Sequence, residues 1–310
     1  MTARPEKLVL IDSASLYFRA FYGMKDPVLA PDGTPVHAVR GFLDFISRLV
    51  VDQGATRVVC CWDDDWRPQF RVEAIPSYKT HRVADAEANA EEVPDTLAPQ
   101  VPVIADVLAA LGIARVGAAG YEADDVIGTL AARATVPTDV VTGDRDLFQV
   151  VDDARSVRVL YTAKGGVGRA DVVTEAVVAE RYGIPGTAYA DFAALRGDPS
   201  DGLPGVPGIG EKTAAALITQ YGSLAGVVRA AEAGDPGARA SVLGKVLAAR
   251  DYLAVAPTVV RVATDVPLPD LDDRLPASPA DPDALAALAD RWNLGTPVAR
   301  LTAVLAAAAA

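Results

Sequence analysis

Acidic residues stand directly after short apolar runs of this chain, where a strand would end. Asp12 follows the run at 7–11, and Asp63 follows the run at 57–62. In a parallel α/β sheet the carboxyl ends of neighbouring strands meet at one edge, and ligands collect there. The chain is therefore expected to fold around a parallel sheet that has an acidic binding edge.

Nine acids share this kind of position, at a strand end, at the start of a helix-like stretch or in a tight loop. Carboxylates brought together from separate strands repel each other unless cations neutralise them. Their hard oxygens favour Mg²⁺ or Mn²⁺, and two such ions ~3.5–4 Å apart form a site that cleaves phosphodiesters. The set consists of Asp12, Asp63, Glu122, Asp124, Asp125, Asp144, Asp146, Asp198 and Asp201.

Each acid taken alone has a simpler explanation. Asp12 can cap the helix that follows it, the acids at 122–125 can complement a helix dipole, and those at 144–146 can form turns. The simpler explanations fail jointly, because four segments deliver acids to equivalent edges and three acids lie within 122–125 without a nearby lysine. A metal-dependent nuclease site is therefore predicted.

The pattern of apolar residues divides the chain into two regions. Residues 1–180 alternate strand-like and helical stretches, which is typical of a parallel sheet covered by helices, whereas residues 181–310 are helical with Gly and Pro between the helices. Within the second region, 264–282 is expected to be an extended connection. The expected strands are 7–11, 57–62, 113–117, 139–142 and 157–161, and the expected helices of the first domain are 38–53, 96–111 and 122–134.

Composition and charge restrict the class of protein. A chain of 310 residues suits two domains with a sizeable core. Its net charge of −12 argues against a nucleic-acid partner, but two divalent ions would return about four positive charges to the acidic edge. No apolar run reaches ~20 residues, and the only cysteines, Cys60 and Cys61, are adjacent, so a cytoplasmic protein without disulfides is expected.

A glycine-rich segment at 205–213 precedes a helical stretch. Backbone N–H groups at the start of that helix, with Lys212 beside them, can hold a phosphate. A P-loop is excluded, because Glu211 separates Lys212 from the last glycine. The simpler alternative is a packing joint between two helices. The candidate DNA-binding residues here are Gly208, Gly210, Lys212 and Thr213.

The polar stretch at 64–95 follows an acidic strand end and has little apolar periodicity, so it is expected to be a functional arch or, alternatively, a disordered insertion. Tyr78, Lys79 and Arg82 give it an aromatic face and two cations, which can stack an unpaired base and stabilise a phosphate. Arg19 can join them. A solvated charged face would explain these residues nearly as well if they stood alone.

In their order and combination these motifs resemble the bacterial 5′→3′ nuclease that forms the N-terminal part of DNA polymerase I, together with its stand-alone relatives in the flap endonuclease superfamily. The resemblance covers nearly the whole chain. It implies a PIN-like, resolvase-like α/β nuclease domain with a helical arch, followed by a helical helix–three-turn–helix (SAM-like) domain. The matching stretches are Leu-Ile-Asp12, Arg19, Trp-Asp63, Tyr78-Lys-Thr-His-Arg82, Gly120-Tyr-Glu-Ala-Asp-Asp125, Thr142-Gly-Asp-Arg-Asp-Leu-Phe-Gln149 and Gly197–Thr213.

The same resemblance implies roles for individual residues. Lys79 and Arg82 act on the scissile phosphate, and Tyr78 stacks on a terminal base. The first divalent ion takes Asp12, Asp63, Glu122, Asp124 and Asp125, and the second takes Asp144, Asp146, Asp198 and Asp201. A monovalent cation, usually K⁺, binds the backbone carbonyls of Leu195, Arg196, Pro204, Val206 and Ile209.

Two departures from the family pattern are visible. Gly202 stands where the family commonly has Asn, which affects the rigidity of the loop without removing an acid. The segment after Trp62 is one residue longer than usual, so either Asp63 or Asp64 can be the ligand.

The expected function is that of a structure-selective 5′–3′ exonuclease and flap endonuclease. It would use two Mg²⁺ or Mn²⁺ ions on DNA with single-stranded 5′ ends, leave 5′-phosphate and 3′-hydroxyl groups, and serve primer and flap removal and repair. A monomer that works with a separate DNA polymerase or sliding clamp is expected. The alternatives are a catalytically silent DNA-junction-binding paralogue and a PIN-type ribonuclease.

Overall fold

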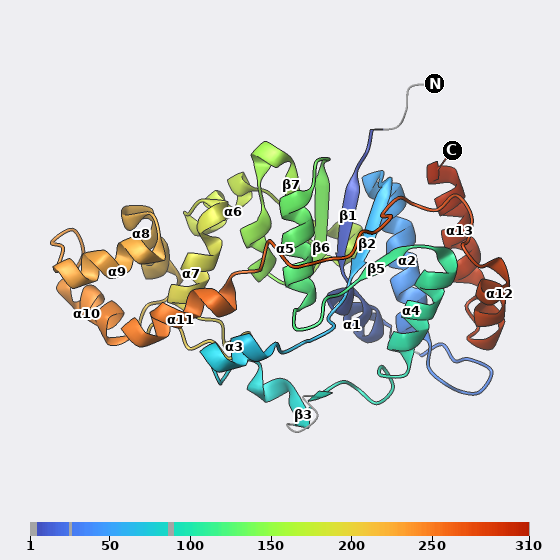
Figure 1. The fold of residues 1–310 in the computed structure, drawn as a ribbon, viewed down its shortest axis with the longest axis horizontal. Helices are drawn as coiled ribbons and strands as arrows, with labels where there is room; N and C mark the ends of the chain where they lie inside the picture. The colour runs from blue at the N-terminus through green and yellow to red at the C-terminus, as the bar shows by residue number, and fades with distance from the viewer. Residues whose placement is uncertain (1–4, 25–26, 86–89, 310) are drawn as a thin grey trace.

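A computed structural model describes residues 5–24, 27–85 and 90–309. Its centre is a six-stranded sheet, parallel except for the antiparallel edge strand β8 (Figure 1). The five expected strands are confirmed to within two residues, whereas β8 has three residues, too few to give a recognisable apolar run. In sheet order the strands are β5 (Ala114–Val116), β2 (Arg57–Cys61), β1 (Leu8–Asp12), β6 (Thr138–Thr142), β7 (Val157–Tyr161) and β8 (Asp171–Val173).

The central strands are apolar along their whole length because both faces of the sheet are covered. In β1, Leu8 and Leu10 belong to the core on one face, and Val9 and Ile11 belong to the core on the other. Asp12, at the end of β1, is in register with Cys61, so Asp63 follows only two residues beyond its level. The parallel register therefore brings the acids that follow the strands to one edge.

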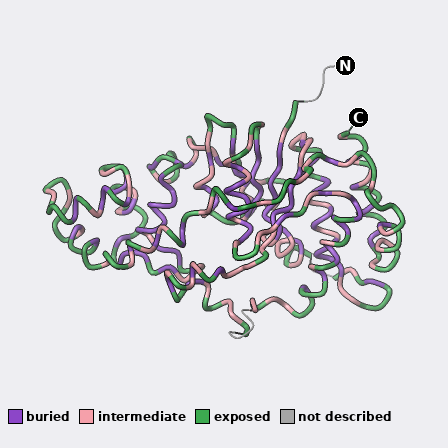
Figure 2. Tube along the Cα trace, viewed as in Figure 1, coloured by how far each residue is buried: buried purple, intermediate pink, exposed green. Residues whose placement is uncertain are grey.

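Helices cover both faces of the sheet. In Figure 2 the buried residues lie mainly where the helices and the sheet meet. The predicted helices of the first domain are confirmed, although the second one starts later than expected, because residues 94–99 form turns up to Pro99. One face carries α1 (Ser13–Gly23), α2 (His37–Gln53) and α4 (Gln100–Leu111), and the other carries α5 (Ala123–Arg133).

The last two helices return to the first domain. After an extended stretch that pairs with β2 through an Arg57–Arg274 bridge, α12 (Pro282–Arg291) packs on α4 and α13 (Gly295–Ala309) packs on α2 (Figure 1). The sequence groups these helices with residues 181–310. In the structure their apolar residues Leu285, Leu301 and Leu305 complete the core on that face of the sheet.

The second helical region is built from six helices, and its core is continuous with the core on the α5 face of the sheet. The six helices are α6 (Glu175–Tyr182), α7 (Tyr189–Arg196), α8 (Glu211–Tyr221), α9 (Leu224–Ala233), α10 (Ala240–Ala248) and α11 (Arg250–Val260).

No helix of the described residues is long and apolar enough to cross a membrane.

The expected arch region contains a short helix, α3 (Gln69–Ala74), a 3₁₀ turn at Thr80–Arg82 and a two-stranded ribbon of β3 (Val83–Asp85) and β4 (Ala90–Glu91). Residues 86–89 of this stretch lie outside the described residues. The base of the arch is thus a structured part of the molecule, below the sheet in Figure 1.

Candidate active site

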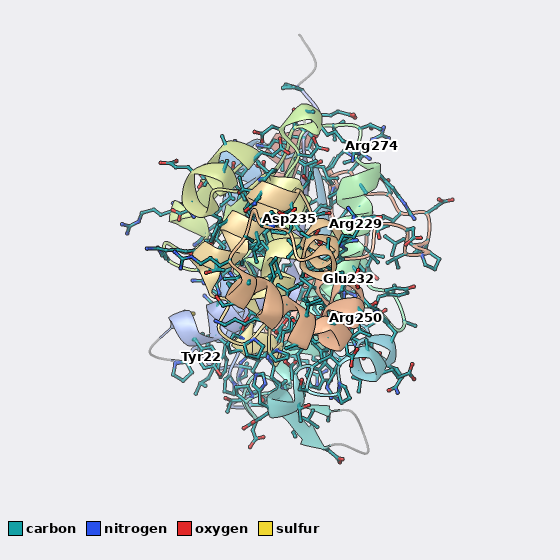
Figure 3. All side chains as sticks on the ribbon, turned by 90° about the vertical axis from the view of Figure 1, so that its left-hand side faces the viewer. Tyr22, Arg229, Glu232, Asp235, Arg250 and Arg274 are labelled. Carbon is teal, nitrogen blue, oxygen red and sulfur yellow. The ribbon has the colours of Figure 1, made fainter. Side chains whose placement is uncertain are left out.

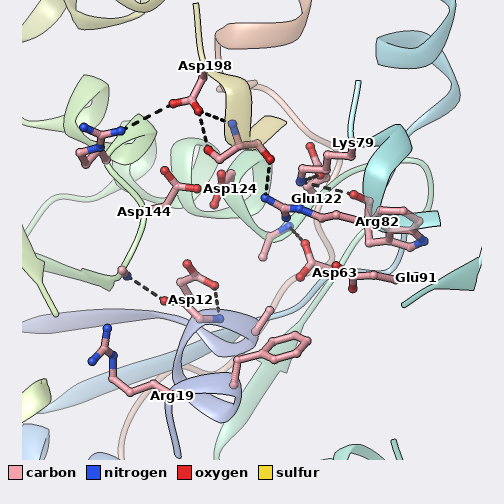
Figure 4. A pocket seen from close by; sticks show the side chains of 18 of the residues that line it. Asp12, Arg19, Asp63, Lys79, Arg82, Glu91, Glu122, Asp124, Asp144 and Asp198 are labelled. Carbon is pink, nitrogen blue, oxygen red and sulfur yellow. Dashed lines mark hydrogen bonds and ion pairs between the residues drawn. The ribbon is translucent and has the colours of Figure 1, made fainter. Parts of the chain in front are cut away.

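A cavity of about 660 Å³ opens at the carboxyl ends of the parallel strands (Figure 4). Six of the nine predicted acids line it, and three of the predicted cations, Arg19, Lys79 and Arg82, line it with them. These side chains come from β1, α1, the base of the arch, the start of α5 and the loops after β2, β6 and α7. The six acids are Asp12, Asp63, Glu122, Asp124, Asp144 and Asp198.

Asp12 both caps a helix and faces the cavity. One carboxylate oxygen accepts the backbone N–H of Ser15 at 3.1 Å, and the other accepts the hydroxyl of Thr142 at 2.6 Å. Burial raises the pKa of Asp12 to about 7, with repulsion from Asp63 and Asp144 adding to the effect. Asp12 therefore caps α1 and at the same time presents its carboxylate to the cavity.

Asp63 lines the cavity, whereas Asp64 is exposed beside Gly117. A carboxylate oxygen of Asp63 accepts the backbone N–H of Ala123 at 2.8 Å, which fixes it at the start of α5. Burial raises the pKa of Asp63, and it raises the pKa of Asp124 strongly, with repulsion from Asp144 as the next cause. The charged forms of Asp63 and Asp124 are thus both disfavoured at the start of α5.

Asp125 does not line the cavity, so the structure does not bring it together with the other predicted ligands of the first ion. It is fully buried, and Arg71 of α3 binds its two oxygens at 2.7 and 2.9 Å. Its carboxylate also accepts the backbone N–H groups of Glu122 and Ala263. Asp125 is therefore a structural residue that joins α3, α5 and the segment after α11.

Tyr78 is also placed differently from the expectation. Its side chain is buried, its residue is 3% exposed, and its hydroxyl donates to Glu122 at 2.6 Å. Lys79 and Arg71 lie over its ring. The ring is thus enclosed between two cations and presents no exposed face in this structure, so base stacking by Tyr78 stays a prediction that would require the ring to move.

Glu122 lines the cavity but is already paired with cations. Arg71 and Lys79 both form ion pairs with its carboxylate, in addition to the hydrogen bond from Tyr78. Lys79 adopts a left-handed backbone conformation (φ 49°) at the start of the 3₁₀ turn. Its ammonium therefore lies between the arch and α5, at the wall of the cavity.

The second group of acids belongs to the segments that follow β6 and α7. Asp144 and Asp198 line the cavity, whereas Asp146 and Asp201 lie behind them. Oδ1 of Asp146 is buried and has no hydrogen-bond partner among the described residues. Burial raises the pKa of Asp146, and repulsion from Asp144 follows as a cause. Such an orphaned oxygen fits coordination of a cation.

Arginines hold two acids of this group, Asp198 and Asp201. Arg82 bonds to Asp201 and to the carbonyl of Ser200, both at 3.0 Å, and Arg196 bonds to Asp198 at 3.3 Å. Arg19 differs, because its buried Nε has no partner among the described residues. Arg19 is therefore free to receive an anionic ligand in the cavity.

Several functional side chains were not predicted from the sequence. Glu91 of β4 and Arg145 line the cavity, Arg196 binds the cavity acid Asp198, and Arg71 binds Asp125 behind the cavity. Arg145 stands between the two predicted acids of its loop, which is a usable signal. Arg71 has no local signal, because its partners lie more than 50 residues away.

The donor set fits hard divalent cations by its chemistry. Among the described residues no three acids, histidines or cysteines are arranged as a ready-made metal site. Carboxylates without a cation repel each other, which is also a cause of the raised pKa values of Asp12, Asp124 and Asp146. A divalent ion removes that repulsion and draws such oxygens together.

The glycine-rich segment forms a compact turn before α8. Val206 donates its N–H to the carbonyl of Leu195 and Ile209 donates to that of Val206, both at 2.9 Å, while Gly205 and Gly208 have positive φ. The helix begins after Gly210, which has no side chain to cap the first N–H groups, and Lys212 is exposed in the first turn. Free N–H groups beside a lysine suit a phosphate.

Comparison with known proteins identifies the two halves of this architecture. Residues 7–183 match the 5′-3′ exonuclease N-terminal resolvase-like domain, and residues 184–283 match the 5′-3′ exonuclease C-terminal SAM fold. The chain belongs to the 5′-3′ exonuclease family. Both domains of the expected fold are confirmed by these matches.

Similar sequences include a protein named 5′-3′ exonuclease and DNA polymerase I. A 5′-3′ exonuclease of Streptomyces coelicolor is 63% identical over 304 residues, which cover 96% of this chain and 100% of the relative. DNA polymerase I of Mycobacterium bovis is 41% identical over 312 residues, 97% of this chain but 32% of that protein. The predicted 5′-3′ exonuclease activity is thereby confirmed.

Solved structures show the same fold at low sequence identity. The T5 D15 protein co-crystallised with metal ions superposes with a TM-score of 0.63 at 16% identity, covering 98% of this exonuclease and 100% of that chain. The catalytic core of Rad2 in complex with DNA substrate gives a TM-score of 0.62 at 16% identity, covering 98% and 93%. The likeness concerns the arrangement of elements.

Proposed function

We propose that this exonuclease hydrolyses phosphodiesters of DNA that carries single-stranded 5′ ends or flaps, with two divalent ions, leaving 5′-phosphate and 3′-hydroxyl groups. The observation that carries the proposal is the cavity at the strand ends, where six carboxylates face Lys79, Arg82 and Arg19. Support comes from neighbours in fold that were crystallised with metal ions and with DNA substrate.

The proposed ligands of the ions are the cavity acids together with two acids behind them. When bound, two Mg²⁺ or Mn²⁺ ions would supply an activated water and stabilise the leaving oxygen. Glu122 is the most heavily paired acid of the set, so we assign it to the rim of the first site. The ligands are Asp12, Asp63, Glu122 and Asp124 for one ion, and Asp144, Asp146, Asp198 and Asp201 for the other.

Three cations of the chain are proposed to hold the scissile phosphate. Lys79 and Arg82 extend from the base of the arch and would offset negative charge that develops on the phosphate oxygens. Arg19 reaches the cavity from α1 with a partner-free Nε, so it can donate to the same phosphate without first breaking an ion pair. Cations on the arch side and on the α1 side of the cavity would hold the phosphate between them.

The turn before α8 is proposed to hold the duplex by its phosphates, independently of sequence. The carbonyls of Leu195, Arg196, Pro204, Val206 and Ile209 are the proposed ligands of K⁺. The proposed phosphate contacts are Gly208, Gly210, Lys212 and Thr213.

Replacing Lys212 tests the duplex contact. Lys212→Ala should weaken duplex binding and reduce the slope of log K against log salt by about one, because one fewer counterion is released. The slope is measured by fluorescence anisotropy over a salt series. Lys164→Ala, a change at another exposed lysine, is the control. A slope unchanged by Lys212→Ala contradicts a phosphate contact there.

The decisive experiment uses the pure exonuclease with a labelled 5′-flap duplex, a recessed duplex and a structured RNA, each with Mg²⁺, Mn²⁺ or chelator. Cleavage of the DNA substrates with either ion, and none with chelator, is expected. Asp63→Asn should abolish cleavage with duplex binding retained, whereas the adjacent Asp64→Asn should leave cleavage intact. Preferred cleavage of RNA, or binding of DNA without cleavage, would overturn the proposal.

The biological setting follows from the polymerase relatives. Because a third of DNA polymerase I corresponds to this chain, removal of primers and flaps beside a separate polymerase or sliding clamp is a consistent role. We place the exonuclease in the cytoplasm as a monomer. Size-exclusion chromatography with light scattering checks the oligomeric state.

A further inference from the structure

A second groove lies in the helical domain, between α9 and α11. Its volume is about 450 Å³, and its floor is apolar: Leu224 and Leu253 are buried there, and Val228 and Pro257 line it. Since Pro257 has no N–H, the carbonyl of Leu253 does not receive its usual helical partner. The groove thus offers an apolar surface beside a turn of α11 that lacks one helical hydrogen bond.

Three arginines, Arg229, Arg250 and Arg261, border this apolar floor. Figure 3 shows Arg229 and Arg250 on the end of the molecule formed by the helical domain, with Tyr22 at the mouth of the acidic cavity well apart from them. Arg229 is exposed and has no hydrogen bond or ion pair within the part of the chain that the structure describes. In a chain of net charge −12, such a cluster of cations is a distinct local feature.

The walls of the groove are held in place before any ligand arrives. Arg261 forms an ion pair with Asp191 at 2.6 Å, and Asp191 also accepts the backbone N–H of Leu224 at 2.9 Å. These contacts fix the start of α9 against the end of α11. A pre-formed groove spares a ligand the cost of ordering the site.

We propose that this groove is a docking site for a short protein segment that presents apolar side chains flanked by carboxylates. The apolar side chains would fill the floor, and the carboxylates would pair with the arginines at the rim. Such a segment of a partner protein would attach the exonuclease without using its catalytic cavity.

Duplex DNA fits the groove less well. A phosphate backbone gains nothing from an apolar floor. Carboxylates already stand among the arginines: Glu232 lies 3.8 Å from Arg250, and Asp191 holds Arg261. These acids would repel the continuous row of phosphates of a duplex, whereas a peptide needs to place only one carboxylate, against the unpaired Arg229.

An unbiased peptide selection tests the chemistry of the partner. A phage-displayed library of random dodecapeptides is panned on the full-length protein, and selected sequences are synthesised and titrated by fluorescence anisotropy. We expect enrichment of Asp and Glu next to Leu, Ile or Phe. Enrichment of neutral or basic peptides, or no enrichment over a blank surface, overturns the proposal.

Charge-reversed variants test the location. The double change Arg229→Glu with Arg250→Glu should weaken binding of the selected peptides by about tenfold or more, because like charges then face each other. Arg239→Glu, an exposed arginine on the same domain outside the groove, should not. Equal binding by the double variant overturns the assignment.

The DNA alternative has its own readout in the same variants. The double variant should bind and cleave the labelled 5′-flap duplex as the unmodified protein does, and its melting curve should show that it is folded. Weaker duplex binding by the double variant, with Arg239→Glu unaffected, would assign the groove to DNA and overturn the proposal. The comparison of duplex binding does not depend on cleavage, so failure of the nuclease proposal leaves that comparison unaffected.

Discussion

At the scale of single residues, Arg71 is the cation that holds the buried acids at the start of α5. It is 2% exposed, it binds both oxygens of Asp125, and its Nε donates to the carbonyl of Val259 at 3.1 Å. Glu122 is its other partner. One guanidinium thereby joins the base of the arch, the acidic start of α5 and the end of α11.

Removing this guanidinium should be costly. Arg71→Met leaves the buried carboxylate of Asp125 without its cation and takes one of two cations from Glu122, so the free energy of unfolding should fall by about 3–5 kcal/mol. Urea unfolding followed by circular dichroism measures it. Arg48→Met is the control, because its ion pair with Asp52 is half exposed and should contribute less than about 1 kcal/mol. Equal losses in the two variants would contradict a buried ionic centre at Arg71.

At the scale of elements, the loop after α7 docks on the base of the arch. The hydroxyl of Ser77 donates to the carbonyl of Gly202 at 2.8 Å, and the N–H of Lys79 donates to the carbonyl of Asp201 at 3.0 Å. Gly202 has φ +73°, and a Cβ there would lie 2.2 Å from the carbonyl oxygen of Ser77. The glycine that departs from the family pattern is therefore what lets the two segments meet.

A methyl group at this position should separate the two segments. In Gly202→Ala the amide of Lys79 should exchange its hydrogen faster, because its acceptor moves away, and DNA cleavage should fall as Lys79 and Arg82 lose their support. Hydrogen exchange by mass spectrometry or NMR measures it. Gly234→Ala is the control. It places a side chain at a similar positive φ, which costs about 1 kcal/mol of strain, but nothing lies within 4 Å of the new Cβ. If both variants leave the Lys79 amide unchanged, the docking is not rigid.

At the scale of the whole molecule, the acids at the sheet edge lower stability when no cation is present. Burial raises the pKa of Asp12 from 3.8 to about 7. Between these values the folded protein binds more protons at Asp12 than the unfolded chain does, so stability falls as pH rises through this range, by up to about 4 kcal/mol for this group. The architecture that gathers the acids is thus least stable near neutral pH without a cation.

This gives a prediction for the metal-free protein. Its Tm should fall as pH rises from about 4 to about 7, and Mg²⁺ should raise the Tm more at pH 7.5 than at pH 5, because binding competes with protonation. Differential scanning calorimetry with and without Mg²⁺ measures both effects. Asp12→Asn should reduce the pH slope. A Tm that is independent of pH, with no larger effect of Mg²⁺ at pH 7.5, would contradict uncompensated charge at this edge.

The sequence by itself determined the sheet and where its acids collect. Apolar runs that end in Asp12 and Asp63 specify strands buried on both faces, and parallel pairing brings their ends together whatever else surrounds them. The glycine turn before α8 was readable for a similar reason, because positive φ at Gly205 and Gly208 is a local requirement. Local chemistry and a regular topology suffice for such features.

Only the tertiary structure decided which polar groups are neutralised and which remain in the cavity. Arg71 binds Asp125 and Glu122 accepts a hydrogen bond from Tyr78, so both side chains are held outside the open part of the cavity. The last two helices pack on the first domain through their apolar faces. Burial and ion pairing depend on segments more than 40 residues apart, as the separation of Tyr78 and Glu122 shows. No local sequence pattern predicts such a contact, because the two residues interact only once the chain has folded.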